Sequence, residues 1–369
     1  MKHGWEIKKL GEVCDIVGGS TPKTGESSYW DGEHFWVTPA ELDGAKYISS
    51  TSRTITDEGV KSAHLQLLPS GTVLLSSRAP IGKVAITAAP MYCNQGFKNL
   101  VCSNKLNNEY AYWFLYSNTE YLNSLGTGAT FKEISKRVVE QIPIPVPPIE
   151  EQERIVEELD CLSGVIEKKK EQLKEYDALA QSIFYTMFGD PNTNNKSLPL
   201  CKFSTMCNNF DSKRKPITAK DRIEGDIPYY GASGVVDYVR GYIFDGDYLL
   251  VSEDGANLEV RHTPIAFSIT GKTWVNNHAH ILKFDHYCSQ IFMEYYINLL
   301  DISDFITGCA QPKLTQANLN NIDVFDVPLA LQQEFASKIE AIEKQKELIK
   351  QSIAETETLF NARMDYYFN

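Results

Sequence analysis

Two stretches of the chain share one apolar spacing, and this pattern constrains the fold more than any other feature. In residues 149–189, the positions 155, 159, 162, 166, 169, 173, 176, 180, 183 and 187 alternate by four and three. In residues 329–369, the positions 335, 339, 342, 346, 349, 353, 356, 360, 363 and 367 do the same, with Lys169, Lys346 and Arg363 as basic interruptions. A sustained 3.5-residue period is typical of coiled coils. We predict two long helices that pair antiparallel; the alternative is two separate amphipathic helices.

The stretches belong to a repeat that covers most of the chain. At an offset of 180 residues, Thr127-Gly128 returns as Thr307-Gly308 and Gln152 returns as Gln332. Further upstream, GTVLLSS at 71–77 resembles GDYLLVS at 246–252. Each copy opens with short β-like runs separated by Gly, Pro and Asn, and a short helix is expected at 107–117 and at 290–300. We predict an α+β fold with globular α/β domains at 1–148 and 190–328, a central helix at 149–189 and a C-terminal helix at 329–369, related by a pseudo-two-fold axis.

The charge is distributed unevenly along the chain. The net charge of −12 argues against a nucleic-acid binder when the chain is taken as a whole, because such binding depends on neutralising phosphates. However, residues 141–190 carry 5 basic and 11 acidic groups, and residues 321–369 carry 5 and 9. Most of the negative charge therefore falls on the predicted helices. The globular parts are close to neutral and can carry local basic faces.

No pattern of a catalytic or cofactor site is present. The chain has no P-loop and no glycine-rich dinucleotide turn, and Gly231-Ala-Ser-Gly234 lacks the spacing of a nucleophile elbow. None of the eight cysteines forms a C-x2-C pair, so we expect no structural zinc and reduced thiols. His278-Ala-His280 offers two imidazoles without an evident third ligand, so no metal site is predicted. No apolar run approaches the length of a membrane span, and we expect a cytoplasmic protein without membrane contact.

Polar and basic residues gather instead in the loops of both globular parts. Arg and Lys pair with guanine and Asn or Gln with adenine, while Lys, Ser and Thr hold phosphates. A stripe of this length spans roughly 48 Å, longer than one turn of B-DNA at roughly 34–36 Å. Two similar modules on a long helix pair therefore suit duplex DNA. The candidate DNA contacts are Ser20, Thr21, Lys23, Ser77, Arg78, Asn94, Gln95 and Lys98 in the first half, and Lys213, Arg214, Tyr230, Ser233, Asn277, His278, Gln311 and Lys313 in the second.

At these residues the chain resembles the specificity subunit of type I restriction–modification systems. The similar strings in the first half are GGSTPKTGESSYWDGEHFWVTPAEL at 18–42, LLSSRAPIGKVAI at 74–86, CNQGF at 93–97, GATFKEIS at 128–135 and PIPVPPIEEQERIV at 143–156. Those in the second half are YYGASGVVDYV at 229–239, VNNHAHIL at 275–282 and GCAQPKLT at 308–315. One departure is DVPLALQQEF, the entry to the second helix, which lacks the acidic pair of the first.

The resemblance implies two target-recognition domains, each reading one half of a bipartite double-stranded DNA site, on a coiled coil that sets the spacer. It implies that two methyltransferase subunits dock on the chain, and that a restriction/translocase subunit completes the complex. It adds Lys132 to the DNA-binding residues and Glu150, Glu151, Gln152, Gln332 and Gln333 as partner-binding residues. It further implies that the chain itself binds no cofactor, with S-adenosylmethionine bound by the methyltransferase and ATP with Mg²⁺ by the nuclease.

Two other functions compete with this interpretation. A non-catalytic adaptor built on a coiled coil would bring proteins together without touching DNA, and the acidity of the whole chain favours it. A free-standing methyltransferase or nuclease is disfavoured because the motifs of those enzymes are missing. The sequence therefore predicts a non-catalytic DNA-recognition subunit.

Overall fold

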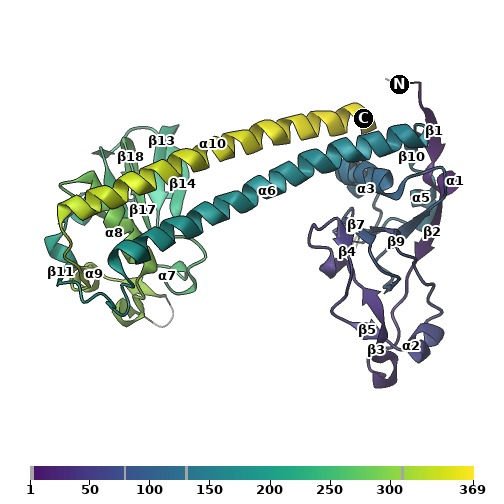
Figure 1. Cartoon of the computed structure of the whole chain (residues 1–369), viewed down its shortest axis with the longest axis horizontal. Helices are drawn as coiled ribbons and strands as arrows, with labels where there is room; N and C mark the ends of the chain where they lie inside the picture. The colour runs from purple at the N-terminus through teal and green to yellow at the C-terminus, as the bar shows by residue number, and fades with distance from the viewer. Residues whose placement is uncertain (1–3, 79, 129–131, 309–310) are drawn as a thin grey trace. The chain divides into compact units, whose positions relative to one another are not determined.

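The computed structural model describes residues 4–78, 80–128, 132–308 and 311–369. The chain forms two compact units, unit 1 with Met1–Lys169 and Ser352–Asn369, and unit 2 with Lys170–Gln351. Two continuous helices, α6 (Ile149–Phe188) and α10 (Leu329–Phe368), contribute one segment each to both units (Figure 1). Each unit thus combines a globular module with its own pair of helix segments.

Over the described residues, the module of unit 1 is built from three small sheets. A five-stranded sheet has the order β2-β9-β6-β7-β4, a three-stranded sheet the order β5-β3-β8, and β1 pairs with β10. The strands are β1 (Glu6–Lys9), β2 (Cys14–Gly18), β3 (Trp30–Val37), β4 (Tyr47–Ile48), β5 (Thr54–Ile55), β6 (Val73–Leu75), β7 (Val84–Thr87), β8 (Tyr92–Cys93), β9 (Lys98–Cys102) and β10 (Pro143–Val146). The helices are α1 (Leu10–Val13), α2 (Asp57–Ser62), α3 (Asn108–Ser117), α4 (Thr119–Ser124) and α5 (Lys136–Glu140), with 3-10 turns η1 (Ser27–Tyr29) and η2 (Pro39–Glu41).

The module of unit 2 has the sheet orders β12-β19-β16-β17 and β14-β13-β18-β15, and the pairs β11-β22 and β20-β21. Its strands are β11 (Leu200–Lys202), β12 (Asn208–Asn209), β13 (Glu224–Gly231), β14 (Gly234–Val239), β15 (Phe244–Asp245), β16 (Tyr248–Ser252), β17 (Ala266–Ile269), β18 (Lys272–Val275), β19 (Ala279–Lys283), β20 (Ile306–Thr307), β21 (Lys313–Leu314) and β22 (Asp323–Phe325). Its helices are α7 (Asn257–Val260), α8 (Tyr287–Leu299) and α9 (Gln316–Asn320), with η3 (Phe203–Thr205), η4 (Asp211–Lys213), η5 (Ala219–Asp221) and η6 (Ser303–Phe305).

The two modules share one topology. The order β2-β9-β6-β7 of unit 1 recurs as β12-β19-β16-β17 in unit 2, and the parallel pair β3-β8 recurs as β13-β18. Short helices α5 and α9 start from the equivalent caps Ser135 and Thr315, whose hydroxyls accept the N–H groups of Val138 and Asn318. The repeat predicted from sparse identities is therefore confirmed at the level of strand pairing.

In both units the segments of α6 and α10 run antiparallel with the predicted stripe turned inward. All twenty stripe positions are buried or partly buried. In unit 1, Glu158 pairs with Arg363 and the Lys169 ammonium donates to the Ser352 hydroxyl at 2.5 Å. In unit 2, the Lys346 ammonium lies 2.7 Å from the Asp177 carboxylate. The basic interruptions of the stripe are thus used for contacts between the helices.

Aromatic side chains fasten each module to its helix segments. In unit 1, the α3 residue Trp113 packs edge-on against Phe360, with ring centroids 5.6 Å apart, and its indole N–H donates to Asp160 at 2.9 Å. In unit 2, Phe292 of α8 packs against Phe188 at 4.9 Å, and both belong to the largest buried cluster of that unit. Short helices were expected at 107–117 and 290–300, and α3 and α8 confirm them with slightly different ends. Over the described residues, no helix combines the length and apolarity needed to cross a membrane.

Unit 2 also encloses the carboxylate of a partly buried acidic residue, Glu294. The Ser268 hydroxyl of β17 donates to the Glu294 carboxylate of α8 at 2.5 Å. Burial raises the pKa of Glu294 to about 7, more than the Ser268 hydrogen bonds lower it. Since the ordinary value is 4.5, the folded protein holds this proton through a pH range in which the unfolded chain has lost it.

We therefore expect the free energy of unfolding of the wild type to fall as the pH rises from about 4.5 to about 7, because Glu294 favours folding only while it is protonated. Glu294→Gln cannot ionise, so the variant should not lose stability in this way. At roughly 1.4 kcal/mol per pKa unit, the variant gains up to about 3 kcal/mol over wild type at pH 8 and little at pH 4.5. Urea unfolding at a series of pH values measures this. Glu224→Gln, at an exposed position of β13, is the control. An equal stability difference between Glu294→Gln and wild type at every pH would contradict the assignment.

Candidate nucleic-acid interface

In unit 1, loops from distant parts of the sequence meet where β6 ends and β9 begins. The Ser77 N–H donates to Gly96 O at 2.7 Å, and the Ile134 N–H donates to Ser77 O at 2.9 Å. The Ser20 N–H donates to Cys93 O at 3.1 Å. Backbone hydrogen bonds thus bring together the loops in which the sequence analysis placed the candidate contacts of the first half.

An ion-pair group closes this set of loops. The Glu133 carboxylate accepts from the Arg78 guanidinium at 3.0 Å and from the Lys98 ammonium at 3.2 Å. Lys98 also donates to the Ser77 hydroxyl at 3.3 Å. Partial burial tends to raise the pKa of Glu133, but the hydrogen bonds from Lys98 and Arg78 outweigh it and hold that pKa below its usual range. Glu133 is therefore a carboxylate that positions two cations.

Unit 2 repeats the same backbone frame. The Glu253 N–H donates to His278 O at 2.9 Å, and the Leu314 N–H donates to Glu253 O at 2.8 Å. These bonds correspond to those made by Ser77 in unit 1. The candidate contacts of the second half are brought together in the same way.

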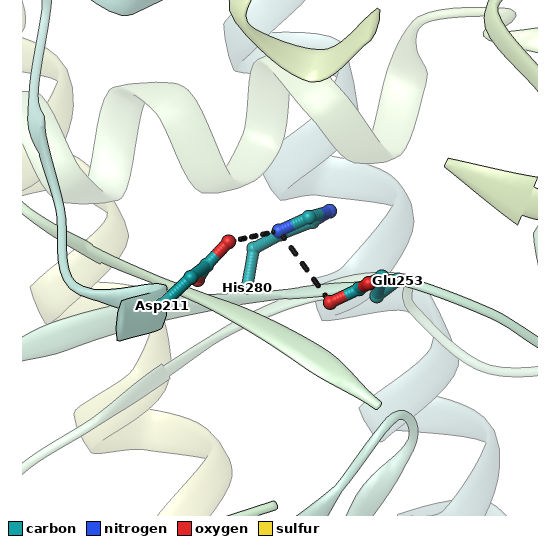
Figure 2. Close-up of side chains that lie close together, drawn as sticks. All are labelled: Asp211, Glu253 and His280. Carbon is teal, nitrogen blue, oxygen red and sulfur yellow. Dashed lines mark hydrogen bonds and ion pairs between the residues drawn. The ribbon is translucent and has the colours of Figure 1, made fainter. Parts of the chain in front are cut away.

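Here the loops are tied by a buried network of acids and bases. Figure 2 shows the carboxylates of Asp211 and Glu253 directed at Nδ1 of His280, at 2.6 and 3.8 Å. The Arg214 guanidinium donates to Glu253, and the Lys313 ammonium lies 3.1 Å from the other oxygen of that carboxylate. Burial tends to raise the pKa of Asp211 and of Glu253, yet hydrogen bonds and nearby positive charge lower both below their usual values. Both acids are therefore ionised at neutral pH.

Asp211, Glu253 and His280 are also close enough to be considered as metal ligands, with one ligand atom of each within 4.8 Å of the others. His280 Nε2, however, lies 2.8 Å from Leu314 O and Nδ1 lies 2.6 Å from the Asp211 carboxylate, so both ring nitrogens already have partners within the protein. A metal ligand needs a nitrogen lone pair, and here the carboxylates already have cationic partners. The geometry fits an ion-pair network better than a metal centre.

From the sequence, His278 and His280 had no evident third ligand, and no metal site was predicted. The structure places two carboxylates beside His280, from 69 residues and 27 residues upstream, whereas His278 pairs with Asp254 at 2.9 Å. The two imidazoles have different partners because neighbouring contacts at the edge of β19 come from different loops. Long-range contacts of this kind leave no local spacing in the sequence.

The two units carry opposite charges on equivalent backbone positions. The bridge between Arg78 and Glu133 in unit 1 corresponds to the bridge between Asp254 and Lys313 in unit 2. The pairing of β6 with β9 and of β16 with β19 matches Val73–Leu100 with Leu249–Leu282. The equivalent pairs are Ser77 and Glu253, Arg78 and Asp254, Lys98 and His280, and Glu133 and Lys313. One frame therefore holds two different electrostatic surfaces.

Most predicted DNA contacts lie at the surface. The exposed ones are Lys23, Arg78, Gln95, Lys132, Lys213, Ser233, Asn277, His278, Gln311 and Lys313, and the partly buried ones are Ser20, Thr21, Asn94, Lys98, Arg214 and Tyr230. Ser77 is 0% exposed, so its side chain is enclosed by the frame and not offered to a ligand. Residues 129–131 and 309–310 of the two matching motifs lie outside the described residues.

Two predicted partner-binding residues are structural instead. The Gln152 side chain is 0% exposed, donates to Pro147 O at 2.8 Å and accepts the Asn107 N–H at 2.8 Å. The Gln332 side chain is 4% exposed and donates to Val327 O at 2.8 Å. Both glutamines repeat because each ties the start of a long helix to its module. Glu150 and Gln333 are exposed, and Glu151 pairs with Arg154 at 2.7 Å.

Three of the acids that hold the loops, Glu133, Asp211 and Glu253, were not predicted from the sequence. Extending the match of 71–77 with 246–252 by a single residue would pair Arg78 with Glu253, whereas the structure pairs Ser77 with Glu253 and Arg78 with Asp254. The sequence match is thus displaced by one residue and gave no usable signal for Glu253. For Asp211 no signal exists either, because its partner His280 is distant in sequence.

Comparison with known proteins gives consistent matches. The family model described as "Type I restriction modification DNA specificity domain" matches residues 2–176 and 202–358. The MjaIX specificity subunit of Methanocaldococcus jannaschii is 38% identical over 190 residues, which are 50% of this chain and 44% of that protein. The EcoprrI specificity subunit of Escherichia coli is 21% identical over 340 residues, 86% of this chain and 82% of that protein. The match thus spans less than half of the first relative and most of the second.

Two solved structures share the fold. The S subunit of a type I restriction–modification system from M. genitalium has a TM-score of 0.61 at 15% identity and covers 99% of this chain and 96% of its own. A chain from a study of complex assembly and conformational transition of the type I R-M system has a TM-score of 0.61 at 17% identity and covers 100% and 98%. At this identity the likeness concerns the fold.

We expect Glu253→Gln to lower the free energy of unfolding by about 3 kcal/mol at pH 7, because it leaves the partly buried Arg214 and the more exposed Lys313 short of a counter-charge. Since the folded pKa of Glu253 is lowered, wild type loses this contribution as the pH falls below the ordinary value of 4.5. The difference between variant and wild type should therefore shrink toward pH 3 in urea unfolding. Asp226→Asn, at an exposed position of β13, should change stability by less than about 0.5 kcal/mol. A pH-independent difference would reject the ion-pair assignment.

Proposed function

Because the chain belongs to the type I restriction–modification DNA specificity family, we propose that it selects the target sequence of such a complex and has no catalytic centre of its own. Each unit reads one half of a bipartite site on double-stranded DNA. The observation that carries this proposal is the shared loop frame with different exposed residues in the two units. A repeated scaffold with variable polar loops is what reading two unrelated half-sites requires.

In unit 1, Arg78 is the residue proposed to contact a base. Its guanidinium is partly exposed, and Glu133 holds it through Nε, leaving its two NH₂ groups for a bidentate contact with guanine. Gln95 is exposed on the adjacent loop and interacts with Thr21, so its amide is held in place as well. Lys23 and Lys132 are exposed cations suited to phosphates.

In unit 2, the equivalent of Arg78 is Asp254, so recognition there uses other residues. Asn277 and His278 are exposed in the turn just before β19, and Lys213 and Gln311 are exposed on other loops of the unit. The Asp211–Glu253–His280 network positions these loops from beneath and stays out of contact with DNA. The inversion of charge between the units accounts for two different half-sites.

The acidic helices are proposed as docking surfaces for protein partners. Their excess of carboxylates repels phosphate, and Glu150 and Gln333 are exposed near the two helix starts. We assign two methyltransferase subunits to these surfaces, with the restriction/translocase subunit joining through them. S-adenosylmethionine and ATP with Mg²⁺ would be bound by those subunits.

The adaptor function remains a distinct alternative because of the acidity of the whole chain. A salt series with duplex DNA in the presence of the methyltransferase partner separates the two functions. Binding that weakens steeply with salt supports DNA recognition. Absence of DNA binding at every salt concentration supports the adaptor.

Arg78→Ala should weaken DNA binding by about 1–3 kcal/mol and relax one half of the site only. The target is first obtained by mapping methylated bases in cells that carry the chain and its methyltransferase. Binding of the assembled complex is then measured on probes with either half scrambled. Lys105→Ala removes an exposed cation of unit 1 beyond the opposite end of β9 and should leave affinity unchanged. Full affinity for a single half-site, or relaxation of the wrong half, contradicts the proposal.

Seven residues inserted in both long helices, after Lys169 and after Gln351, should lengthen the recognised spacer. The insertions preserve the stripe and add roughly 10 Å of helix, or roughly three base pairs at 3.4 Å each. Methylation mapping reports the new spacer. Seven residues added instead to the polar turn at 191–196, which follows α6, should leave the spacer unchanged. A constant spacer after the helix insertions would rule out a measuring role for the helices.

A further inference from the structure

Two cysteines of unit 1 face each other across a strand pair. Cys14 begins β2 and Cys102 ends β9, and the two are direct partners in the antiparallel register. Their sulfur atoms are 3.7 Å apart, although 88 residues separate them in the sequence. We propose that Cys14 and Cys102 form a reversible dithiol–disulfide site that exchanges with low-molecular-weight disulfides.

The backbone at this site allows a disulfide. One position further along, the Ser103 N–H donates to Val13 O at 2.9 Å, and the Cys14 N–H donates to Leu10 O within its own segment. The cysteines therefore occupy a non-hydrogen-bonded pair, where the Cα atoms of opposite residues lie about 4.5 Å apart. This separation falls within the range of about 4.4–6.8 Å that disulfides span. Closing the bond requires side-chain rotation and no change of register.

The two thiols differ in access. Cys14 is 6% exposed, and its pKa is raised by the hydrogen bond with Cys102 and by burial. Cys102 is partly exposed and lines a cavity of 450 Å³ together with Ser103 and Asn104. Cys102 is therefore the thiol that a small disulfide reaches first.

The exchange proceeds in two steps. The Cys102 thiolate attacks one sulfur of a small disulfide such as oxidised glutathione, forms a mixed disulfide and releases one small thiol. The Cys14 sulfur then attacks the Cys102 sulfur and releases the second small thiol. The protein dithiol loses two electrons and two protons, which the two released thiols carry. Reduced glutathione reverses both steps.

The equivalent positions in unit 2 show that this fold forms without a pair of cysteines. The register of β12 with β19, Asn208 opposite Lys283, places Cys207 and Phe284 at the positions equivalent to Cys14 and Cys102. Cys207 is the single thiol of this pair of positions, and the other position holds the buried ring of Phe284. Burial raises the pKa of Cys207 to about 12. Cys207 is thus an internal control for a similarly placed thiol without a partner.

The disulfide would link two strands, β2 and β9, that lead into loops with candidate DNA contacts. β2 runs directly into the loop with Ser20 and Thr21, and β9 begins at Lys98. A link between positions 88 residues apart restricts the unfolded chain strongly. Oxidation should therefore raise the melting temperature of unit 1 while leaving the frame of the loops intact.

The test uses the folded chain of 369 residues equilibrated with mixtures of reduced and oxidised glutathione. Remaining thiols are alkylated, the chain is digested without reduction, and peptides are identified by mass spectrometry. We expect a Cys14–Cys102 crosslinked peptide that appears with oxidised glutathione, disappears with reduced glutathione and is accompanied by a higher melting temperature. Cys207 should form no intrachain link, and Cys102→Ser should lose both the crosslink and the temperature shift.

Two results would overturn the proposal. One is alkylation of both cysteines at every glutathione ratio in the wild-type chain. The other is a lasting mixed disulfide on Cys102 with Cys14 still free. Neither readout depends on DNA or on partner subunits, so the outcome is independent of the proposed function. The wild-type chain alone decides the matter if Cys102→Ser fails to fold.

Discussion

The burial of one stripe on each long helix is the constraint on which the rest of the structure depends. In each unit the segments of α6 and α10 cover each other, and the module then packs on the pair through aromatic side chains such as Trp113 and Phe292. Small sheets of two to five strands bury little surface alone. The helix segments supply the missing hydrophobic face, so a module and its helix pair form one unit.

The two units hold their loops in the same backbone geometry but place side chains of opposite charge on it. The same backbone hydrogen bonds organise the loops of both units, while Arg78 is replaced by Asp254 and Glu133 by Lys313 at equivalent positions. Because the frame is held by main-chain bonds, its side chains are free to differ without changing the fold. Internal ion pairs then fix the side chains locally, through Glu133 in unit 1 and Glu253 in unit 2.

Periodic features were the reliable part of the sequence. The stripe, the repeat, and helices α3 and α8 all recur at fixed spacings, and each reflects a local rule of helix geometry or strand alternation. Gln152 and Gln332 show the limit of this reasoning. Their repetition was correctly noticed but wrongly assigned to partners, because a repeated polar residue at a helix start serves the backbone of its own unit equally well.

By itself, the sequence determined that the chain is a duplicated α+β module with two long amphipathic helices, since hydrophobic periodicity is written locally. Only the tertiary structure decided which polar residues face solvent and which face one another. Ser77 turned out to be enclosed, and Asp211, Glu253 and His280 form one network although they are scattered over 70 positions. The physical reason is that ion pairs and thiol pairs depend on distance in space, and strand pairing brings together residues that no local pattern connects.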